Sequence, residues 1–337
     1  MIGFAHDGAF EVTTLTELQR VRGEISPDLF LGCYAYATQS GFRTFELGMG
    51  QDFWANTKSR WLFGIDYGRS DPRALKEIAG KTNTEVRVFD GRYVVDSTGF
   101  IPRRDYHAKV ALLENSSMGA HGLVLGSGNF SYNGLWRSVE AGASLTTTNI
   151  PETEKRIDPV KAVFEEYWKN SCPLADIVTD YEGRLAEFIS TKDAKRVEQP
   201  EVPANGFWIE AGYVTKNRGP DKPGNQIFAP NGFRKFFNLG KVKGSSTLIG
   251  EIKFSTRIGP NITKNYREND NGMEKLTLPM PEEHGFGVYD GKVLLFQPTG
   301  DEFLLSAIEL GEFELAYGHR LANVEKMGGG RRYGELK

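Results

Sequence analysis

A change of hydrophobic periodicity near residue 191 most constrains what this chain can fold into. Before that point, strand-like apolar runs alternate with helix-like segments. The segment 71–82 has helical spacing, with Asp71 placed to cap the helix and Pro72 in its first turn. The expected strands lie at 28–37, 60–67, 85–90, 107–113, 122–126 and 140–145, and two further helices at 158–170 and 177–190. This rhythm predicts an α/β domain with a parallel or mixed sheet flanked by helices.

After residue 204 the apolar runs become short and are separated by Gly, Asn and Pro, which predicts an all-β barrel or sandwich with few helices. The runs are FWIEAGYV, NQIFA, GFRKFFNL, TLIGEIKF, FGVYD, KVLLFQP, FLLSAIEL and FELAYG. A chain of 337 residues is long enough for two cores. We therefore expect domains at 1–192 and 204–337, joined by a charged, proline-containing linker at 193–203.

The charge of the second half is unevenly distributed, although the whole chain carries only -3. Residues 211–267 hold eleven basic and two acidic side chains, a local charge of +9, and residues 268–314 have the reverse, -9. One face for phosphates and one for solvent is a natural interpretation. The alternative is two solvated surfaces that segregate by chance.

The remaining bulk features favour a cytoplasmic protein. No apolar stretch approaches the roughly 18 residues of a membrane span, and the N-terminus lacks a signal-peptide pattern. The two cysteines have no ligand spacing. We expect no membrane association, no metal and no cofactor.

The stretch 105–145 carries the chemistry. His107 and Lys109 are two residues apart, so on a strand their side chains share a face. Ser127 and Asn129 follow the next apolar run, with Gly126 and Gly128 allowing close approach of a phosphate, and Glu140 begins the next run. Such a set supplies a nucleophile, donors for phosphoryl oxygens and an acid. The alternative is that His107 and Lys109 are ordinary polar residues on a half-exposed strand.

The order His-x-Lys, Gly-Ser-x-Asn and Glu resembles the signature of the phospholipase D superfamily. The resemblance implies that His107 attacks phosphorus and forms a phosphohistidine, while Lys109, Asn129 and Ser127 hold the phosphoryl oxygens. It also implies that Glu140 accepts the other N–H of the histidine. Glu114 replaces the acid that closes the usual motif, and Ser138 stands where relatives often have Asn.

The family's mechanism uses two histidines, whereas this chain has one His-x-Lys pair. We therefore expect a homodimer whose two-fold axis brings His107 of each subunit to one phosphate.

Three basic elements in the second half favour nucleic acid as the substrate. The loops 213–226 and 256–267 are rich in side chains that contact bases and phosphates, and 328–334 (GGGRRYG) adds two arginines. Each could also be a solvated turn. Together with HAK, GSGNF, Glu140 and IFAPNGFRKFF, the arrangement resembles BfiI-type restriction endonucleases, which join a phospholipase D-like nuclease to a DNA-recognition domain similar to plant B-three domains.

This second resemblance implies a mostly-β pseudobarrel whose arms, at 215–226 and 257–267, enter the major groove of double-stranded DNA. The candidate DNA-binding residues are Thr215, Lys216, Asn217, Arg218, Lys222, Asn225, Gln226, Arg257, Asn261, Lys264, Asn265, Arg267, Arg331 and Arg332. The function implied is a sequence-specific, metal-independent DNA endonuclease of restriction type, with a possible companion DNA methyltransferase in the host. Two alternatives stay open: a phospholipid or other phosphodiesterase, and a DNA-binding protein with an inactive nuclease domain.

Overall fold

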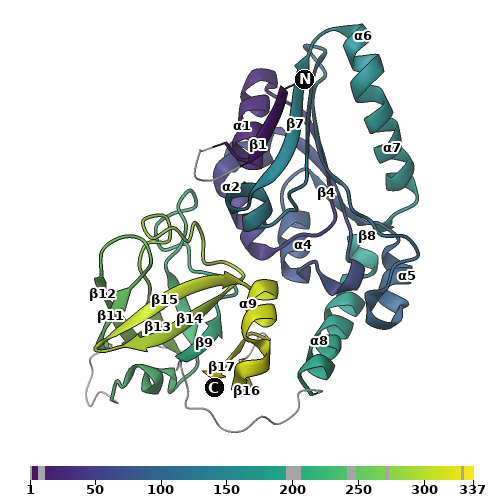
Figure 1. The fold of residues 1–337 in the computed structure, drawn as a ribbon. Helices are drawn as coiled ribbons and strands as arrows, with labels where there is room; N and C mark the ends of the chain where they lie inside the picture. Colours follow the sequence, from purple (N-terminus) through teal and green to yellow (C-terminus); the bar gives the residue numbers. More distant parts are fainter. Residues whose placement is uncertain (1, 7–11, 195–205, 241–247, 270–272, 328–329) are drawn as a thin grey trace. The chain divides into compact units, whose positions relative to one another are not determined.

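The computed structural model divides the chain into two compact units, Met1–Lys195 and Arg196–Lys337 (Figure 1). It describes residues 2–6, 12–194, 206–240, 248–269, 273–327 and 330–337. Most of the predicted linker, 193–203, lies outside the described residues.

The first unit is built from strands and helices in alternation. Its strands are β1 (Ile2–His6), β2 (Leu29–Tyr34), β3 (Lys58–Phe63), β4 (Thr84–Val88), β5 (Lys109–Asn115), β6 (Ala120–Gly126), β7 (Glu140–Thr147) and β8 (Cys172–Pro173). Its α-helices are α1 (Thr14–Ile25), α2 (Gln39–Met49), α3 (Gln51–Asn56), α4 (Pro72–Ala79), α5 (Gly91–Asp96), α6 (Ile150–Glu152), α7 (Asp158–Lys169) and α8 (Val178–Ala194). Short turns of other helical types lie at η2 (Asp66–Gly68), η3 (Thr98–Phe100), η4 (Asn133–Arg137), η5 (Thr153–Ile157) and η6 (Leu174–Asp176).

These strands form one mixed sheet in the order β1-β7-β6-β5-β2-β3-β4-β8. Strands β2, β3 and β4 are parallel, and the other pairs are antiparallel. The prediction of a mixed sheet flanked by helices is confirmed. Helix α4 also begins as predicted, because the Asp71 side chain accepts a hydrogen bond from the Arg73 N–H at 2.8 Å.

Side chains alternate between the two faces of this sheet, and both faces are covered. Phe30 and Trp61 pack in one cluster with helices α1 to α5 and α8. Their neighbours Leu31 and Leu62 pack in another cluster with Trp168 and other residues of α7. Burial on both faces explains why the strands read as continuous apolar runs.

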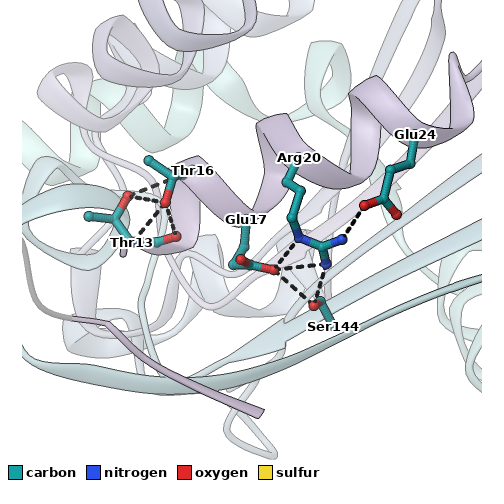
Figure 2. A network of polar contacts seen from close by, with 6 residues as sticks. All are labelled: Thr13, Thr16, Glu17, Arg20, Glu24 and Ser144. Carbon is teal, nitrogen blue, oxygen red and sulfur yellow. Dashed lines mark hydrogen bonds and ion pairs between the residues drawn. The ribbon is translucent and has the colours of Figure 1, made fainter. Parts of the chain in front are cut away.

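Helix α1, which the periodicity did not predict, is fastened to β7 by a polar network (Figure 2). Arg20 donates to the Ser144 hydroxyl at 2.8 Å, and that hydroxyl donates to Glu17 at 2.9 Å. At the start of the helix, Thr13 and Thr16 cap each other's backbone N–H groups. The network fixes the position of the strand that begins with Glu140.

The second unit is mostly β. Its strands are β9 (Gly206–Glu210), β10 (Gln226–Ala229), β11 (Leu248–Ser255), β12 (Ile262–Glu268), β13 (Glu274–Thr277), β14 (Lys292–Thr299), β15 (Glu302–Glu309), β16 (Leu321–Lys326) and β17 (Arg332–Leu336). They hydrogen bond in the order β10-β13-β12-β11-β15-β14-β9-β17-β16. Since β10 and β16 lie at opposite ends of this order, closure into a pseudobarrel stays a prediction.

Two apolar runs of this unit form helical segments, although their spacing favoured strands. FELAYG belongs to α9 (Leu310–Tyr317), and GFRKFF forms a 3₁₀ turn, η7 (Phe233–Phe237); a second, η8 (Gly318–Arg320), follows α9. Phe313 of α9 is buried against Trp208 and Leu295 of the sheet. This packing, rather than local pattern, makes the segment a helix.

The two oppositely charged segments do not form wholly separate surfaces. Arg218 pairs with Glu282, and Arg234 pairs with Glu274. Part of the local charge difference is therefore neutralised inside the unit, which corrects the interpretation of one basic and one acidic face. Among the helices of the described ranges, none is both long and apolar enough to cross a membrane.

Candidate functional site

One edge of the first sheet collects all five predicted catalytic residues. The register pairs Tyr34 at the end of β2 with both Phe63 at the end of β3 and Lys109 at the start of β5. Strand β6 ends at this edge with Gly126, and β7 begins there with Glu140. His107 precedes β5, while Ser127 and Asn129 follow β6.

His107 and Lys109 contact each other directly. The Lys109 Nζ lies 2.8 Å from His107 Nδ1 and donates to the His107 carbonyl oxygen at 3.0 Å. The histidine is exposed, whereas Lys109 is only 8% exposed. The strand begins at Lys109, two residues later than predicted, so the histidine lies on the loop that leads into it.

The electrostatics of Lys109 place two further groups nearby. Burial lowers the pKa of Lys109, because a charged ammonium is poorly solvated there. The carboxylate of Glu140 acts against this effect, and the Arg69 guanidinium adds to the lowering of the pKa. The site therefore contains a buried cation with one acid and one further cation within electrostatic reach.

Glu140 is bound to Ser127 in this structure. The Ser127 hydroxyl donates to the Glu140 carboxylate and accepts from the Ala141 N–H at 3.1 Å. Within the described residues, Glu140 makes no hydrogen bond to His107, so its role as partner of the imidazole stays a prediction.

Asn129 offers an unused acceptor beside this group. Its Oδ1 is buried and has no hydrogen-bond partner among the described residues, an arrangement that is unfavourable unless a donor completes it. The loop can turn back tightly because Gly128 lies against the backbone of Gly134, where a Cβ would come within 2.1 Å of the Gly134 oxygen.

Glu114 lies away from the site. It is paired with Leu29 at the far end of β5, about 17 Å from Lys109 by strand geometry. Its buried carboxylate accepts from Lys161 at 2.8 Å and faces His121 Nδ1 at 4.0 Å. Glu114 thus joins β5, β6 and α7, far from the other site residues.

The loop after β3 places Tyr67 and Arg69, which sequence reasoning missed, beside the segment that carries His107. The Tyr67 hydroxyl donates to Asp105 at 2.8 Å, and Arg69 lies over the Tyr67 ring, 5.6 Å from its centroid. The only signal in the sequence was a turn-like GIDYGRSDP at the end of an apolar run, where functional loops are common.

The second unit has a groove on the outer face of β10, β13 and β12. It has a volume of about 500 Å³ and is lined by Gln226, Thr263, Lys264, Asn265, Arg267, Lys275 and Thr277. The lining holds three cations with amides and hydroxyls, and no carboxylate. On the neighbouring strand, Glu251 stands opposite Asn265.

Two of the cations in the groove face each other across strands. Arg267 of β12 is opposite Lys275 of β13, so their side chains share a face. Neither forms an ion pair with a carboxylate among the described residues. Like charges placed directly opposite destabilise a sheet, so an anion bound between them would relieve the repulsion.

The predicted DNA-binding residues divide into two groups. Gln226, Lys264, Asn265 and Arg267 line the groove. Lys275 and Thr277 were missed because only the structure brings β13 beside β12, and Thr263, inside the predicted arm 257–267, was not selected. Thr215 bridges to Gln226 at the rim of its loop, and the same loop carries Lys216 and the exposed Lys222; Arg257 is exposed on the β11–β12 turn.

Several others make contacts inside the unit, and their part in DNA binding stays a prediction. Asn217 donates to Asn225 at 2.9 Å, and the buried Asn225 donates to the Leu278 carbonyl at 2.8 Å, so these amides close the loop. Arg218 pairs with Glu282. The Asn261 amide donates to Glu302 at 2.8 Å.

The two C-terminal arginines likewise have internal partners. Arg331 donates to the backbone carbonyls of Ala211 at 3.0 Å and Phe228 at 2.8 Å. Arg332 is 4% exposed and donates to Glu210 at 2.7 Å and Glu314 at 2.6 Å. Both guanidinium groups thus have partners inside the unit, and their contact with DNA stays a prediction.

Within the described ranges, no group of three or more His, Cys, Asp or Glu side chains is arranged to hold a metal ion.

Comparison with known proteins gives weak similarities to the first half. No family model matches the chain, and no curated protein matches it. Among solved structures, NucT from Helicobacter pylori is 14% identical with a TM-score of 0.35, over 51% of this chain and 98% of that one. A phospholipase D family member, Nuc from Salmonella typhimurium, is 12% identical with a TM-score of 0.36, over 51% and 97%. The phosphatidylserine synthase of Haemophilus influenzae Rd KW20 is 12% identical with a TM-score of 0.32, over 53% and 42%. Because these similarities are weak, function must be inferred from the site residues.

Proposed function

We propose that the protein is a phosphodiesterase of phospholipase D type that cleaves DNA, as a sequence-specific and metal-independent endonuclease. The observation that carries the proposal is the meeting of His107, Lys109, Ser127, Asn129 and Glu140 at one sheet edge. An exposed imidazole beside a buried cation is suited to attack at a phosphoryl centre.

In the proposed reaction, Nε2 of His107 attacks phosphorus and forms a P–N bond while the P–O bond to the leaving sugar breaks. A second imidazole, present as the imidazolium, gives its Nε2 proton to the leaving oxygen and becomes neutral. Water then attacks phosphorus, its proton returns to the second imidazole, and the electron pair of the P–N bond returns to His107. Lys109 and the amide N–H of Asn129 hold the phosphoryl oxygens throughout.

The contact between Lys109 and Nδ1 of His107 determines which tautomer the resting histidine adopts. When a protonated Lys109 donates to Nδ1, the neutral ring carries its proton on Nε2, so this contact holds the tautomer that cannot attack through Nε2. The attacking form needs its proton on Nδ1 and an acceptor there. We propose that phosphate draws Lys109 away and that Glu140, released from Ser127, accepts the Nδ1 proton.

The second imidazole comes from another chain. This chain has one His-x-Lys pair, and His107 is exposed at the sheet edge. We propose a homodimer in which the partner's His107 approaches the same phosphate from the opposite side.

The groove of the second unit supports DNA rather than a lipid as the substrate. Its three cations match phosphates, and Gln226, Asn265 and Arg267 are side chains that can read base edges in the major groove. A host that makes such an enzyme would need a companion methyltransferase to protect its own sites.

Digestion of unmethylated plasmid DNA in excess EDTA tests this function. We expect discrete fragments from the wild-type protein and from His319→Ala, which removes an exposed histidine of the second unit, and none from His107→Ala. Rapid quenching should trap DNA linked to the protein through an acid-labile bond, as expected of phosphohistidine. DNA binding that persists without cleavage by the folded wild-type protein would instead indicate an inactive nuclease domain.

A further inference from the structure

The loop between β3 and α4 reaches the catalytic edge and belongs to no part of the reaction described above. It follows Phe63, which the register places one strand from Tyr34 and two strands from Lys109. Strands two positions apart lie about 10 Å from each other. A long side chain on this loop can therefore reach a group beside the scissile phosphate while Lys109 holds the phosphate itself.

Two hydrogen bonds tie this loop to the segment that carries His107. Asp66 accepts from the Tyr106 N–H at 2.8 Å, and the Tyr67 hydroxyl donates to Asp105 at 2.8 Å. Tyr67 also has a φ of 57°, in the left-handed region that bulky side chains rarely adopt. Such a conformation persists when its surroundings hold it, and it is frequent at functional sites. Here it turns a 44% exposed ring toward the loop of the nucleophile.

Arg69 is the cation that this arrangement presents. Its guanidinium lies 5.6 Å from the centre of the Tyr67 ring and forms no ion pair with a carboxylate among the described residues. The side chain is exposed. It is close enough to Lys109 to contribute to the lowered pKa of that residue. Two cations within electrostatic reach of each other suit two neighbouring anions.

We infer that Arg69 binds the phosphate next to the scissile one, with the Tyr67 ring and its bond to Asp105 positioning the guanidinium. This inference rests on the proposed function and specifies its substrate class: a polymer of phosphodiesters, in which a second phosphate always adjoins the first. A simple phospholipid has a single phosphate and cannot make this contact. Arg69 thus selects polynucleotides over single-phosphate diesters at the catalytic edge itself.

Steady-state kinetics on two substrates test the inference. Bis(4-nitrophenyl) phosphate has one phosphate, and a short duplex oligonucleotide that contains the cleavage site mapped on plasmid DNA has several. For Arg69→Ala we expect the KM for the oligonucleotide to rise about tenfold, the usual effect of losing one charge-assisted hydrogen bond. The kcat/KM for the small diester should change by less than about twofold, and Arg69→Lys should recover part of the loss.

A matched control is Arg156→Ala, which also removes one arginine from the first unit. Arg156 pairs with Glu152 beyond the far end of β7, at the edge opposite Glu140. Tyr67→Phe keeps the ring but removes the bond to Asp105, so it should raise the oligonucleotide KM less than Arg69→Ala does. The salt dependence of that KM should lose about 0.9 from its logarithmic slope in Arg69→Ala, the share of one phosphate of a duplex.

The outcomes separate the inference from the function on which it rests. If the wild-type protein hydrolyses neither substrate, the proposed function fails. If it hydrolyses both, and Arg69→Ala matches Arg156→Ala on both, the flanking-phosphate contact is refuted. Equal losses of Arg69→Ala on both substrates would also overturn it, because they would place Arg69 on the scissile phosphate.

Discussion

Replacing the facing cations of the groove should stabilise the fold while weakening DNA binding. Arg267 and Lys275 stand directly opposite each other on β12 and β13. A like-charge pair in this position destabilises a sheet by roughly 0.2–1 kcal/mol. The double variant Arg267→Gln/Lys275→Gln removes the repulsion and keeps side chains of similar length. Its free energy of unfolding should therefore rise by about that amount.

The same change should reduce the salt dependence of DNA affinity by a calculable amount. Each lost phosphate contact lowers the slope of log affinity against log salt by about 0.9, so two contacts account for about 1.8. A fourfold rise in salt, from about 50 to 200 mM, would then weaken the wild-type complex about 12 times more than that of the variant. If only the total positive charge mattered, removing two charges elsewhere in the second unit would lower the slope by the same amount.

Fluorescence anisotropy with a labelled duplex, measured across this salt range, gives the slopes. Lys235→Gln/Lys326→Gln is the control, because it removes the same charge from two exposed lysines of the second unit that do not line the groove. Chemical unfolding of the same proteins gives the stabilities. If the two double variants have equal slopes, the groove does not contact DNA. If the groove variant is the less stable one, the repulsion argument is wrong.

Three further predictions concern the catalytic edge and the support of the groove. If two subunits share one active site, only dimers of two wild-type chains are active. An equal mixture of wild-type and His107→Ala chains, after subunit exchange, should then keep a quarter of the activity of wild type at the same total protein concentration. A remaining activity of one half would show that each chain acts alone. Because burial lowers the pKa of Lys109 below 10.5 and only the protonated amine binds phosphate, binding should be lost as pH rises through the lowered value. The KM for DNA should then rise at a pH below 10.5, and Lys109→Arg should lack this limb in a pH profile. Glu274 is 1% exposed and bound to Arg234, so Glu274→Gln should destabilise the second unit by about 3 kcal/mol in chemical unfolding, whereas an unchanged midpoint would mean that the pair contributes nothing net.

The sequence by itself determined several strands and helices of the first unit and the candidate residues of its site. Continuous apolar runs predicted β2 to β4 because both faces of that sheet are buried. Asp71 and Pro72 marked the start of α4, because capping depends on neighbours in the chain. His107, Lys109, Ser127, Asn129 and Glu140 could be recognised because their order and spacing along the chain are themselves the pattern.

Tertiary structure decided which residues meet across the chain. Arg69 reaches the catalytic edge because β3 runs parallel beside β2, and Lys275 reaches the groove because β13 pairs with β12. A list of basic residues could not show that Arg332 is buried between Glu210 and Glu314, since an ion pair depends on distance in space. The segment FELAYG became a helix through the packing of Phe313, a contact with strands about a hundred and about twenty residues away in the chain. Local propensity acts over a few residues, whereas pairing, burial and charge neutralisation depend on partners that only the folded chain brings together.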